Sequence, residues 1–209
     1  MSFSHHKNKH FIHLTYKDAL KMALKSHSCI EKVEHEKVLS MSPKFINSIR
    51  IGLKETLNKD LFVYNNSLNG VPFAFGKIHI NKSEIIDDLE RFNLTLEVSY
   101  MVFKPRLGKI LRATINKIAD HHLGCLIHGC INGSIIQPNF DYLSASQKEI
   151  IDNIKVGSEV LFTITKIDNH NDILFVVGEI APQFYLGKKR KAQSSEEFSA
   201  IKKIKEEIE

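Results

Sequence analysis

Three features of the sequence predict an α+β protein built in two parts. Leu94 to Phe103 alternates its side chains between two faces and is the most regular strand pattern in the chain. Two segments that precede it carry apolar residues at helical spacing. After a link that contains Pro105, five short strand patterns are interrupted by one helix signal. The first two features predict a mixed helix and sheet domain, and the third predicts a small β-barrel.

Two helices and a strand are predicted near the N-terminus. Thr15 is suited to cap the first helix because Asp18 follows three residues later, and apolar residues then recur at helical spacing. A strand is predicted over Ile30 to Leu39, and a second, amphipathic helix over Ile46 to Leu57. We expect residues 1–27 to be a flexible segment that contains the first helix.

A turn and an irregular strand follow. Asn65 to Gly70 is rich in turn-forming residues, and the next strand is predicted over Val71 to Ile80. Its apolar pattern changes phase at Gly76, which predicts a β-bulge, and Pro72 predicts an edge position in the sheet. The charged segment Lys82 to Arg91 is expected to be a connection that could include a short helix. Three residues are expected to share one face of the strand before the bulge: Val71, Phe73 and Phe75.

The second part of the chain has the strand order of a small closed barrel. Ser144 begins a capping box, which predicts a helix through Ile154, between the third and fourth strands. Five strands with a helix in this position have the order of an OB-fold. We therefore expect a domain at 28–104, a five-stranded OB-fold β-barrel at 105–185 and a charged basic tail at 186–209. The strand patterns of the barrel are Leu111 to Ile115, Leu123 to His128, Ile131 to Ile136, Glu159 to Ile167 and Ile173 to Ile180.

The positive charge of the chain lies at its two ends. The sequence has 29 Lys and Arg residues against 24 Asp and Glu residues, a net charge of +5. Residues 1–27 and 186–209 carry this excess, and the body between them is close to neutral. Tight non-specific binding of nucleic acid requires many basic side chains on the folded body. The charge distribution therefore predicts that any binding of RNA is modest and sensitive to salt.

The candidate RNA contacts are a small basic group on the first barrel strand. They are Lys109, Arg112 and Lys117. OB-folds bind single strands by stacking bases on aromatic side chains, and the strands expected to present that face, within 123–136, contain no Phe, Tyr or Trp. Weak contact with RNA and a simple exposed face both fit this composition.

No catalytic residue, metal or cofactor is predicted. The cysteines and histidines between His121 and Cys130 raise the alternative of a zinc site, but Cys125 and Cys130 are spaced as buried structural cysteines on strand-like sequence. Phosphate-binding loop, nucleophile-elbow and zinc-protease motifs do not occur in the sequence. No apolar run approaches about 18 residues and the N-terminus lacks a signal-peptide core, so we expect a cytosolic or nuclear protein.

A compact basic run follows the predicted barrel. Such a run is typical of a nuclear-import signal, and a solvated charged tail is the alternative. Its residues are Lys188, Lys189, Arg190 and Lys191.

Several segments resemble a family of transcription proteins. Met101-Val102-Phe103-Lys104-Pro105, followed by Leu107-Gly108-Lys109-Ile110, resembles the domain junction of the stalk subunits of archaeal and eukaryotic RNA polymerases. The run from His122 to Ile135, with Leu-Gly-Cys-Leu-Ile-His-Gly at its centre, resembles the RNA polymerase I branch of this family. Leu68-Asn69-Gly70-Val71-Pro72 is similar to the same branch. The resemblance extends over about residues 28–183.

The resemblance implies a fold and a role. The fold is a truncated ribonucleoprotein-like tip domain followed by the OB-fold, and the role is that of a non-catalytic stalk subunit in ribosomal RNA gene transcription. The implied partners are the RNA polymerase I core subunits, a second stalk subunit that forms a heterodimer, the polymerase I initiation factor and, as an open alternative, nascent single-stranded RNA. The implied location is the nucleus and nucleolus.

Six residues are candidates for contact with the polymerase core or a partner subunit. We expect Met101 and Phe103 to be half-exposed at the domain junction, where they would help to fix the OB-fold or meet the partner subunit. The six are Asn69, Gly70, Val71, Pro72, Met101 and Phe103. Two other functions stay open: the equivalent stalk subunit of another nuclear polymerase, and a free-standing OB-fold protein that binds single-stranded RNA.

Overall fold

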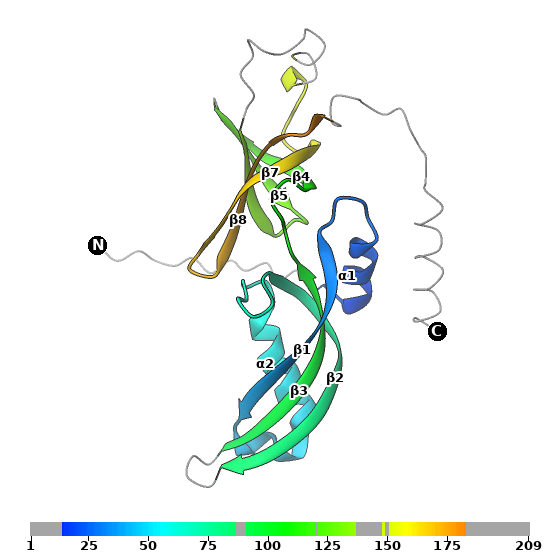
Figure 1. Ribbon diagram of the computed structural model, residues 1–209, viewed down its shortest axis with the longest axis vertical. Coiled ribbons are helices and arrows are strands. Elements are labelled where there is room, and N and C mark those ends of the chain that lie inside the picture. Colours follow the sequence, from blue (N-terminus) through cyan, green and yellow to red (C-terminus); the bar gives the residue numbers. More distant parts are fainter. Residues whose placement is uncertain (1–13, 87–90, 120, 137–147, 149–150, 183–209) are drawn as a thin grey trace, which may run out of the picture.

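The computed structural model describes residues 14–86, 91–119, 121–136, 148 and 151–182. A three-stranded sheet with helices forms the N-terminal part, and a closed barrel forms the C-terminal part (Figure 1). Among the described residues, none of the helices is both long and apolar enough to cross a membrane. In chain order the elements are α1 (Tyr16–Ala23), β1 (Ile30–Met41), η1 (Pro43–Ser48), α2 (Ile49–Asp60), β2 (Val71–Ile86), β3 (Arg91–Phe103), β4 (Ile110–Ile118), β5 (His122–Ile127), β6 (Ile131–Ile136), β7 (Glu159–His170) and β8 (Ile173–Ile180).

Helix α1 begins where its capping residue predicts. The Thr15 hydroxyl accepts a hydrogen bond from the Asp18 backbone N–H at 3.2 Å, which satisfies one of the free donors of the first turn. Ala19 is completely buried against the rest of the molecule. A Cβ atom at Gly76 would lie 2.8 Å from the Tyr16 ring, so the missing side chain of this glycine gives α1 room on the sheet.

Strand β3 is the centre of the antiparallel sheet, between β1 and β2. One face of β3 packs with Leu53 and Leu57 of α2. Gly52 lets α2 lie close to the end of β1 and to η1, because a Cβ atom there would lie 2.3 Å from Met41 Cε and 2.6 Å from Phe45 Cγ. The β3 residues in this cluster are Phe92, Leu94, Leu96, Val98, Tyr100 and Val102.

Strand β2 confirms the predicted bulge and corrects two other expectations. Its pairing with β3 shifts between Phe75 and Ile78, around Gly76, and it lies at an edge, as Pro72 predicts. A second shift, between Pro72 and Ala74, puts Phe75 against the α2 cluster while Phe73 packs in the other core. The expectation that Val71, Phe73 and Phe75 share one face is therefore wrong.

The charged segment that follows is also strand rather than connection. β2 continues through Ile86 and β3 starts at Arg91, because both pair in antiparallel register at their ends. The expected connection over Lys82 to Arg91 is therefore wrong for the strand residues, and 87–90 lie outside the described residues.

The barrel has the predicted OB-fold connectivity. Its strands close in the order β4-β5-β6-β8-β7, with β6 and β8 parallel and the other pairs antiparallel. A Cβ atom at Gly178 would lie 2.2 Å from the Thr163 carbonyl oxygen, so this glycine lets β7 and β8 approach each other. Lys148, Ile151 and Asp152 are helical, and most of the helix predicted from Ser144 lies outside the described residues. The α+β class and the barrel are confirmed.

The two parts share one apolar core. Ile30, Phe73 and Phe103 of the sheet belong to the same buried cluster as Leu111 and Phe162 of the barrel. A second contact lies at the β7–β8 turn, where the Asp172 carbonyl oxygen accepts a hydrogen bond from the Tyr64 N–H at 3.0 Å. The barrel is thus packed directly on one end of the sheet.

Candidate interaction surfaces

His128 joins the two parts at their centre. It lies in the β5–β6 turn with a φ of 52°, and its Nε2 atom is 2.7 Å from the Ser28 carbonyl oxygen. Because a carbonyl only accepts, Nε2 carries the hydrogen. The imidazole meets Phe73 and Phe103 edge-on, with ring centroids 5.7 and 5.4 Å apart. Burial lowers the pKa of His128; the hydrogen bond to Ser28 opposes this shift and the charge of Lys25 adds to it, and the net lowering favours a neutral imidazole.

The predicted partner contacts lie at this junction, and most of them are buried. Met101 and Phe103 are 1% and 0% exposed, so the expectation that they are half-exposed is wrong. The end of β3 is covered on both faces, by the α2 cluster on one side and by the shared core on the other. The continuous apolar run from Tyr100 to Phe103 is the sequence signal for this double burial.

The remaining predicted contacts form the end of the turn before β2 and the first two residues of that strand. Gly70, Val71 and Pro72 are buried, and Asn69 is exposed with a φ of 49°. A Cβ atom at Gly70 would lie 2.5 Å from the Phe103 carbonyl oxygen, so only glycine fits there. Of the six candidates, Asn69 alone offers its side chain to a partner. The others hold the sheet against the barrel.

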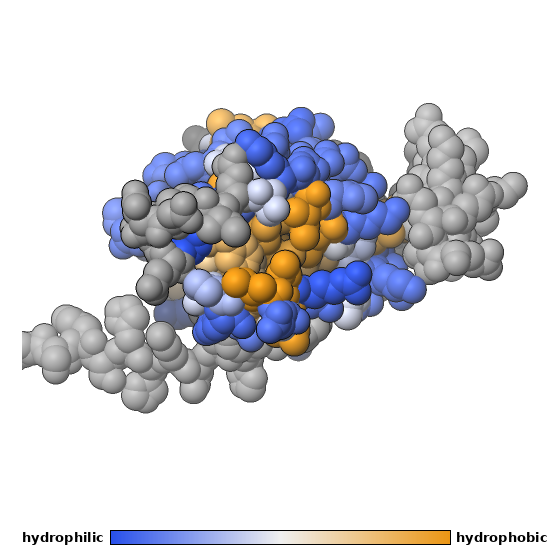
Figure 2. Space-filling model, turned by 90° about the horizontal axis from the view of Figure 1, so that it is seen from below, coloured by the Kyte–Doolittle hydropathy of each residue, from blue (hydrophilic) through white to orange (hydrophobic). Residues whose placement is uncertain are grey.

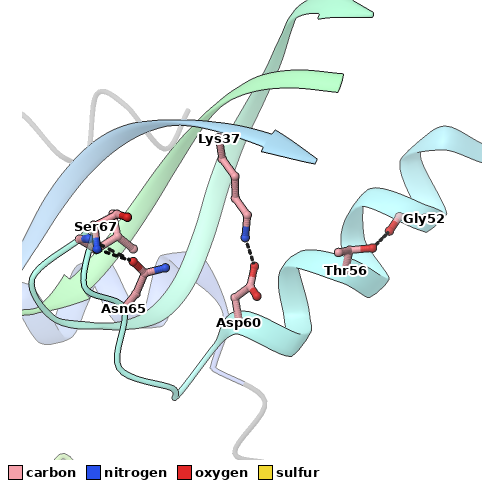
Figure 3. A network of polar contacts seen from close by, with 7 residues as sticks. Lys37, Gly52, Thr56, Asp60, Asn65 and Ser67 are labelled. Atoms are coloured by element: carbon pink, nitrogen blue, oxygen red, sulfur yellow. Dashed lines mark hydrogen bonds and ion pairs between the residues drawn. The ribbon is translucent and has the colours of Figure 1, made fainter. Parts of the chain in front are cut away.

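Local side-chain contacts support the turn and the nearby helix (Figure 3). The Asn65 side-chain oxygen accepts hydrogen bonds from the backbone N–H groups of Ser67 at 2.9 Å and Leu68 at 3.2 Å. Lys37 of β1 and Asp60 of α2 form an ion pair at 2.5 Å. These contacts fix the end of α2 and the following turn beside the sheet.

The three candidate RNA contacts are exposed but do not converge. Lys109 precedes β4 and Lys117 is near its far end, a separation of about 26 Å along an extended strand. The Arg112 guanidinium lies between them in sequence and pairs with Glu159 at 3.3 Å. The group is therefore a line along β4 rather than one phosphate site.

The barrel fold adds an aromatic residue that the sequence interpretation missed. Parallel pairing places Phe175 of β8 opposite Asn132 of β6, and the Phe175 side chain is 36% exposed. The OB-fold strand order, which puts the last strand beside the third, is the signal that could have identified it. The described strands β5, β6 and β8 contain Glu179 and no Lys or Arg. Their outer surface is nearly uncharged.

An apolar surface lies at the end of the molecule away from the barrel. Seen from below, apolar side chains fill a shallow hollow surrounded by hydrophilic residues (Figure 2). η1 and the start of α2 lie at this end (Figure 1). They expose Ile46 by 60% and Ile51 by 59%.

No group of three or more His, Cys, Asp or Glu side chains that could hold a metal ion occurs within the part of the chain that the structure describes. Cys125 is buried and Cys130 half-buried, both as free thiols. Burial raises the pKa of each thiol to about 12, so both stay protonated at neutral pH. The basic run Lys188 to Lys191 lies outside the described residues.

Comparison with known proteins places the chain in a family. No protein-family model matches it. It is 34% identical to the human "DNA-directed RNA polymerase I subunit RPA43" over 157 residues, which cover 74% of this chain and 46% of that protein. The mouse protein of the same name is 31% identical over 165 residues (78% of this chain, 49% of that protein), and the zebrafish protein is 31% identical over 156 residues (74% and 39%).

The chain spans less than half the length of these three relatives. Among solved structures, it is similar to the solution structure of GSP13 from Bacillus subtilis, with a TM-score of 0.32 and 14% identity, over 44% of this chain and 66% of that one. The sequence identity to the curated relatives, 31–34% over about three quarters of the chain, shows that this chain belongs to the family of the RNA polymerase I subunit RPA43.

Proposed function

We propose that this chain is a non-catalytic stalk subunit of RNA polymerase I that acts in ribosomal RNA gene transcription in the nucleus and nucleolus. The observation that carries the proposal is the 34% identity to the human RPA43 subunit over residues that make up 74% of this chain. The polymerase named in the curated relatives favours this polymerase over another nuclear one.

The shape of the molecule supports docking at one end. The sheet and the barrel lie end to end along the longest axis, with the barrel at one extremity (Figure 1). η1 and the start of α2, which expose Ile46 and Ile51, are at the other extremity (Figure 1), and the view of that end shows an apolar hollow (Figure 2). Burial of apolar area supplies most of the affinity of stable protein interfaces. We therefore assign contact with the polymerase core to the η1 and α2 end.

The outer barrel surface suits a protein partner better than RNA. Ile173 is 63% exposed beside Phe175, and the three neighbouring strands β5, β6 and β8 offer no Lys or Arg side chain in the described residues. Binding of an RNA backbone requires basic side chains that neutralise its phosphate charges. This surface is our candidate for the second stalk subunit or the initiation factor, and weak RNA contact is assigned to the β4 line of Lys109 and Lys117.

Co-purification tests the polymerase assignment. A tagged full-length chain would be expressed in its native cell and purified at moderate salt. We expect the large RNA polymerase I subunits in stoichiometric amounts. Recovery of another polymerase would keep the family and reject the branch. Recovery of RNA alone, or of nothing, would favour a free-standing OB-fold protein.

A double substitution tests the docking end. Ile46→Glu with Ile51→Glu should reduce the recovered polymerase about tenfold or more, since charges there oppose burial. Leu107→Glu, at a residue 66% exposed in the link before β4, is the matched control and should recover polymerase normally. Full recovery with the double variant, at unchanged thermal stability, would exclude this end as the docking surface.

Nuclear import is proposed for Lys188 to Lys191. A chain truncated after residue 185 should accumulate outside the nucleus. Normal nuclear accumulation of the truncated chain would show that import does not depend on this run.

A further inference from the structure

Strand β1 is a long and regular free edge of the N-terminal sheet. It has 12 residues and, among the described residues, pairs only with β3, in a register without shifts from Ile30 opposite Phe103 to Met41 opposite Phe92. The other edge, β2, contains Pro72 and three register shifts. Bulges and prolines protect edges from further pairing, and β1 has neither.

The backbone groups that β1 leaves free can be identified from the pairing. The Cys29 carbonyl oxygen accepts a hydrogen bond from the Lys104 N–H at 2.8 Å, just before the first pair of the ladder. Antiparallel alternation then turns the backbone groups of the even-numbered residues away from β3. In the described part of the chain, no backbone hydrogen bond reaches them from the free side. They belong to Lys32, Glu34, Glu36, Val38 and Ser40, whose side chains are all exposed.

The charges beside this edge are unbalanced. Glu36 lies directly opposite Glu97 of β3, and both side chains are exposed. By the same alternation they form a non-hydrogen-bonded pair, in which Cα atoms are about 4.5 Å apart and like charges destabilise the sheet. Lys32 is 3.9 Å from Glu34, but neither Glu36 nor Glu97 has an ion-pair partner among the described residues.

We propose that the free edge of β1 binds an extended strand of a partner protein that carries Lys or Arg on the face of Glu34 and Glu36. The free N–H and C=O groups select an extended backbone, as in β-strand addition. The carboxylates select the basic side chains, because an added strand places its side chains directly beside Glu36. The inference goes beyond polymerase docking and does not depend on it.

A second copy of this chain is a poorer occupant of the edge. Antiparallel pairing of two β1 strands about Glu34 or about Glu36 sets that carboxylate opposite its own copy. Pairing about the residue between them sets Glu34 opposite Glu36. Each of these three arrangements adds like charges to an edge that already carries them. Pairing about Val33 instead sets Lys32 opposite Glu34, but it leaves Glu36 opposite Ile30 and uses only the first part of β1.

A peptide probe tests the proposal on the isolated full-length chain. The probe is the acetylated and amidated peptide Lys-Thr-Lys-Val-Lys-Thr-Lys-Val-Lys, and the measurement is amide hydrogen exchange resolved by residue. When the peptide saturates the chain, we expect the amides of the even-numbered β1 residues from Lys32 to Ser40 to exchange at about one tenth of their rate in the free chain, or more slowly still. The control peptide is N-methylated at its central lysines, whose N–H groups would face β1. It keeps every charge and should give no protection.

Two matched pairs of variants complete the experiment. Val38→Pro removes an outward N–H and should abolish protection, whereas Val38→Thr keeps it and should bind as the unmodified chain does. Glu36→Gln should weaken binding about two- to fivefold, and Ser40→Thr should leave it unchanged. Thermal unfolding of each variant shows whether it is folded. If the proline variant does not fold, the N-methylated peptide still tests the backbone hydrogen bonds on the unmodified chain.

Three results would overturn the proposal. One is an unchanged rate of amide exchange in β1 however much peptide is added. Another is equal protection by the N-methylated peptide, which would mean that charge alone attracts it. The third is protection of β2 in place of β1.

Discussion

The imidazole Nε2 of His128 donates a hydrogen bond to the carbonyl oxygen of Ser28 across 2.7 Å, and this contact links the barrel to the turn before β1. Ser28 is itself buried, and its hydroxyl donates to the Ala23 carbonyl oxygen at the end of α1 at 3.1 Å. One polar chain therefore runs from α1 through the Ser28 turn to the barrel, next to Phe73 and Phe103.

Replacement of His128 should weaken the whole fold. His128→Ala removes the hydrogen bond to Ser28 and the ring packed on two phenylalanines, and we expect the free energy of unfolding to fall by about 2–4 kcal/mol. His128→Asn retains a donor and tolerates the positive φ, so it should cost less. Urea unfolding would measure both. A loss below about 0.5 kcal/mol for the alanine variant would show that the junction does not depend on this contact.

Stability should fall in mild acid. Burial lowers the pKa of His128 below its ordinary value of 6.5, and burial followed by the Arg112 charge does the same for His27. The unfolded chain therefore takes up protons first as pH falls. The stabilisation that the two neutral histidines contribute is fully present above about pH 6.5, the pKa of the unfolded state. It is lost as the pH falls through the lower pKa of the folded state. The urea midpoint should be lower at pH 5.5 than at pH 7.5, and His128→Asn should reduce the difference. An equal difference in the variant would assign the effect to other groups.

Closure of the barrel should depend on Gly178. In Gly178→Ala the new methyl group would lie 2.2 Å from a backbone oxygen, that of Thr163, which cannot move without opening the barrel. We expect a loss of about 3 kcal/mol. Gly124→Ala is the control, because its nearest contact, at 2.9 Å, is the flexible end of the Asn116 side chain, and it should cost about 1 kcal/mol. Thermal unfolding compares the two, and equal losses would contradict the role given to Gly178.

Release of Arg112 should strengthen RNA binding. Glu159→Gln removes the carboxylate that pairs with Arg112 at 3.3 Å and leaves an additional base on β4. We expect the affinity for single-stranded RNA to rise about two- to threefold. The slope of log affinity against log salt concentration should become more negative by about 0.7, the value for one new phosphate contact. Asp168→Asn makes the same charge change beside Lys166 on β7, and fluorescence anisotropy can compare the variants. Equal gains in both would point to net charge alone.

Local patterns in the sequence predicted much of the architecture. Thr15 caps α1, Gly76 marks a bulge, and Ile131 to Ile136 and Ile173 to Ile180 form strands with the expected bounds. These features depend on neighbours within a few residues, on side-chain alternation and on capping chemistry. Such information is contained in short stretches of sequence.

The tertiary structure alone decided which surfaces are available. Met101 and Phe103 have the composition of partner contacts, but the barrel covers them. Phe175 reaches the β6 surface, and Glu159 reaches Arg112, through pairings between strands far apart in the chain. The sequence by itself determined most of the elements and the order in which the barrel strands follow one another along the chain, because these follow from local periodicity. Burial and charge pairing at the candidate sites were decided only when distant strands packed together, because each depends on atoms that no local pattern brings near.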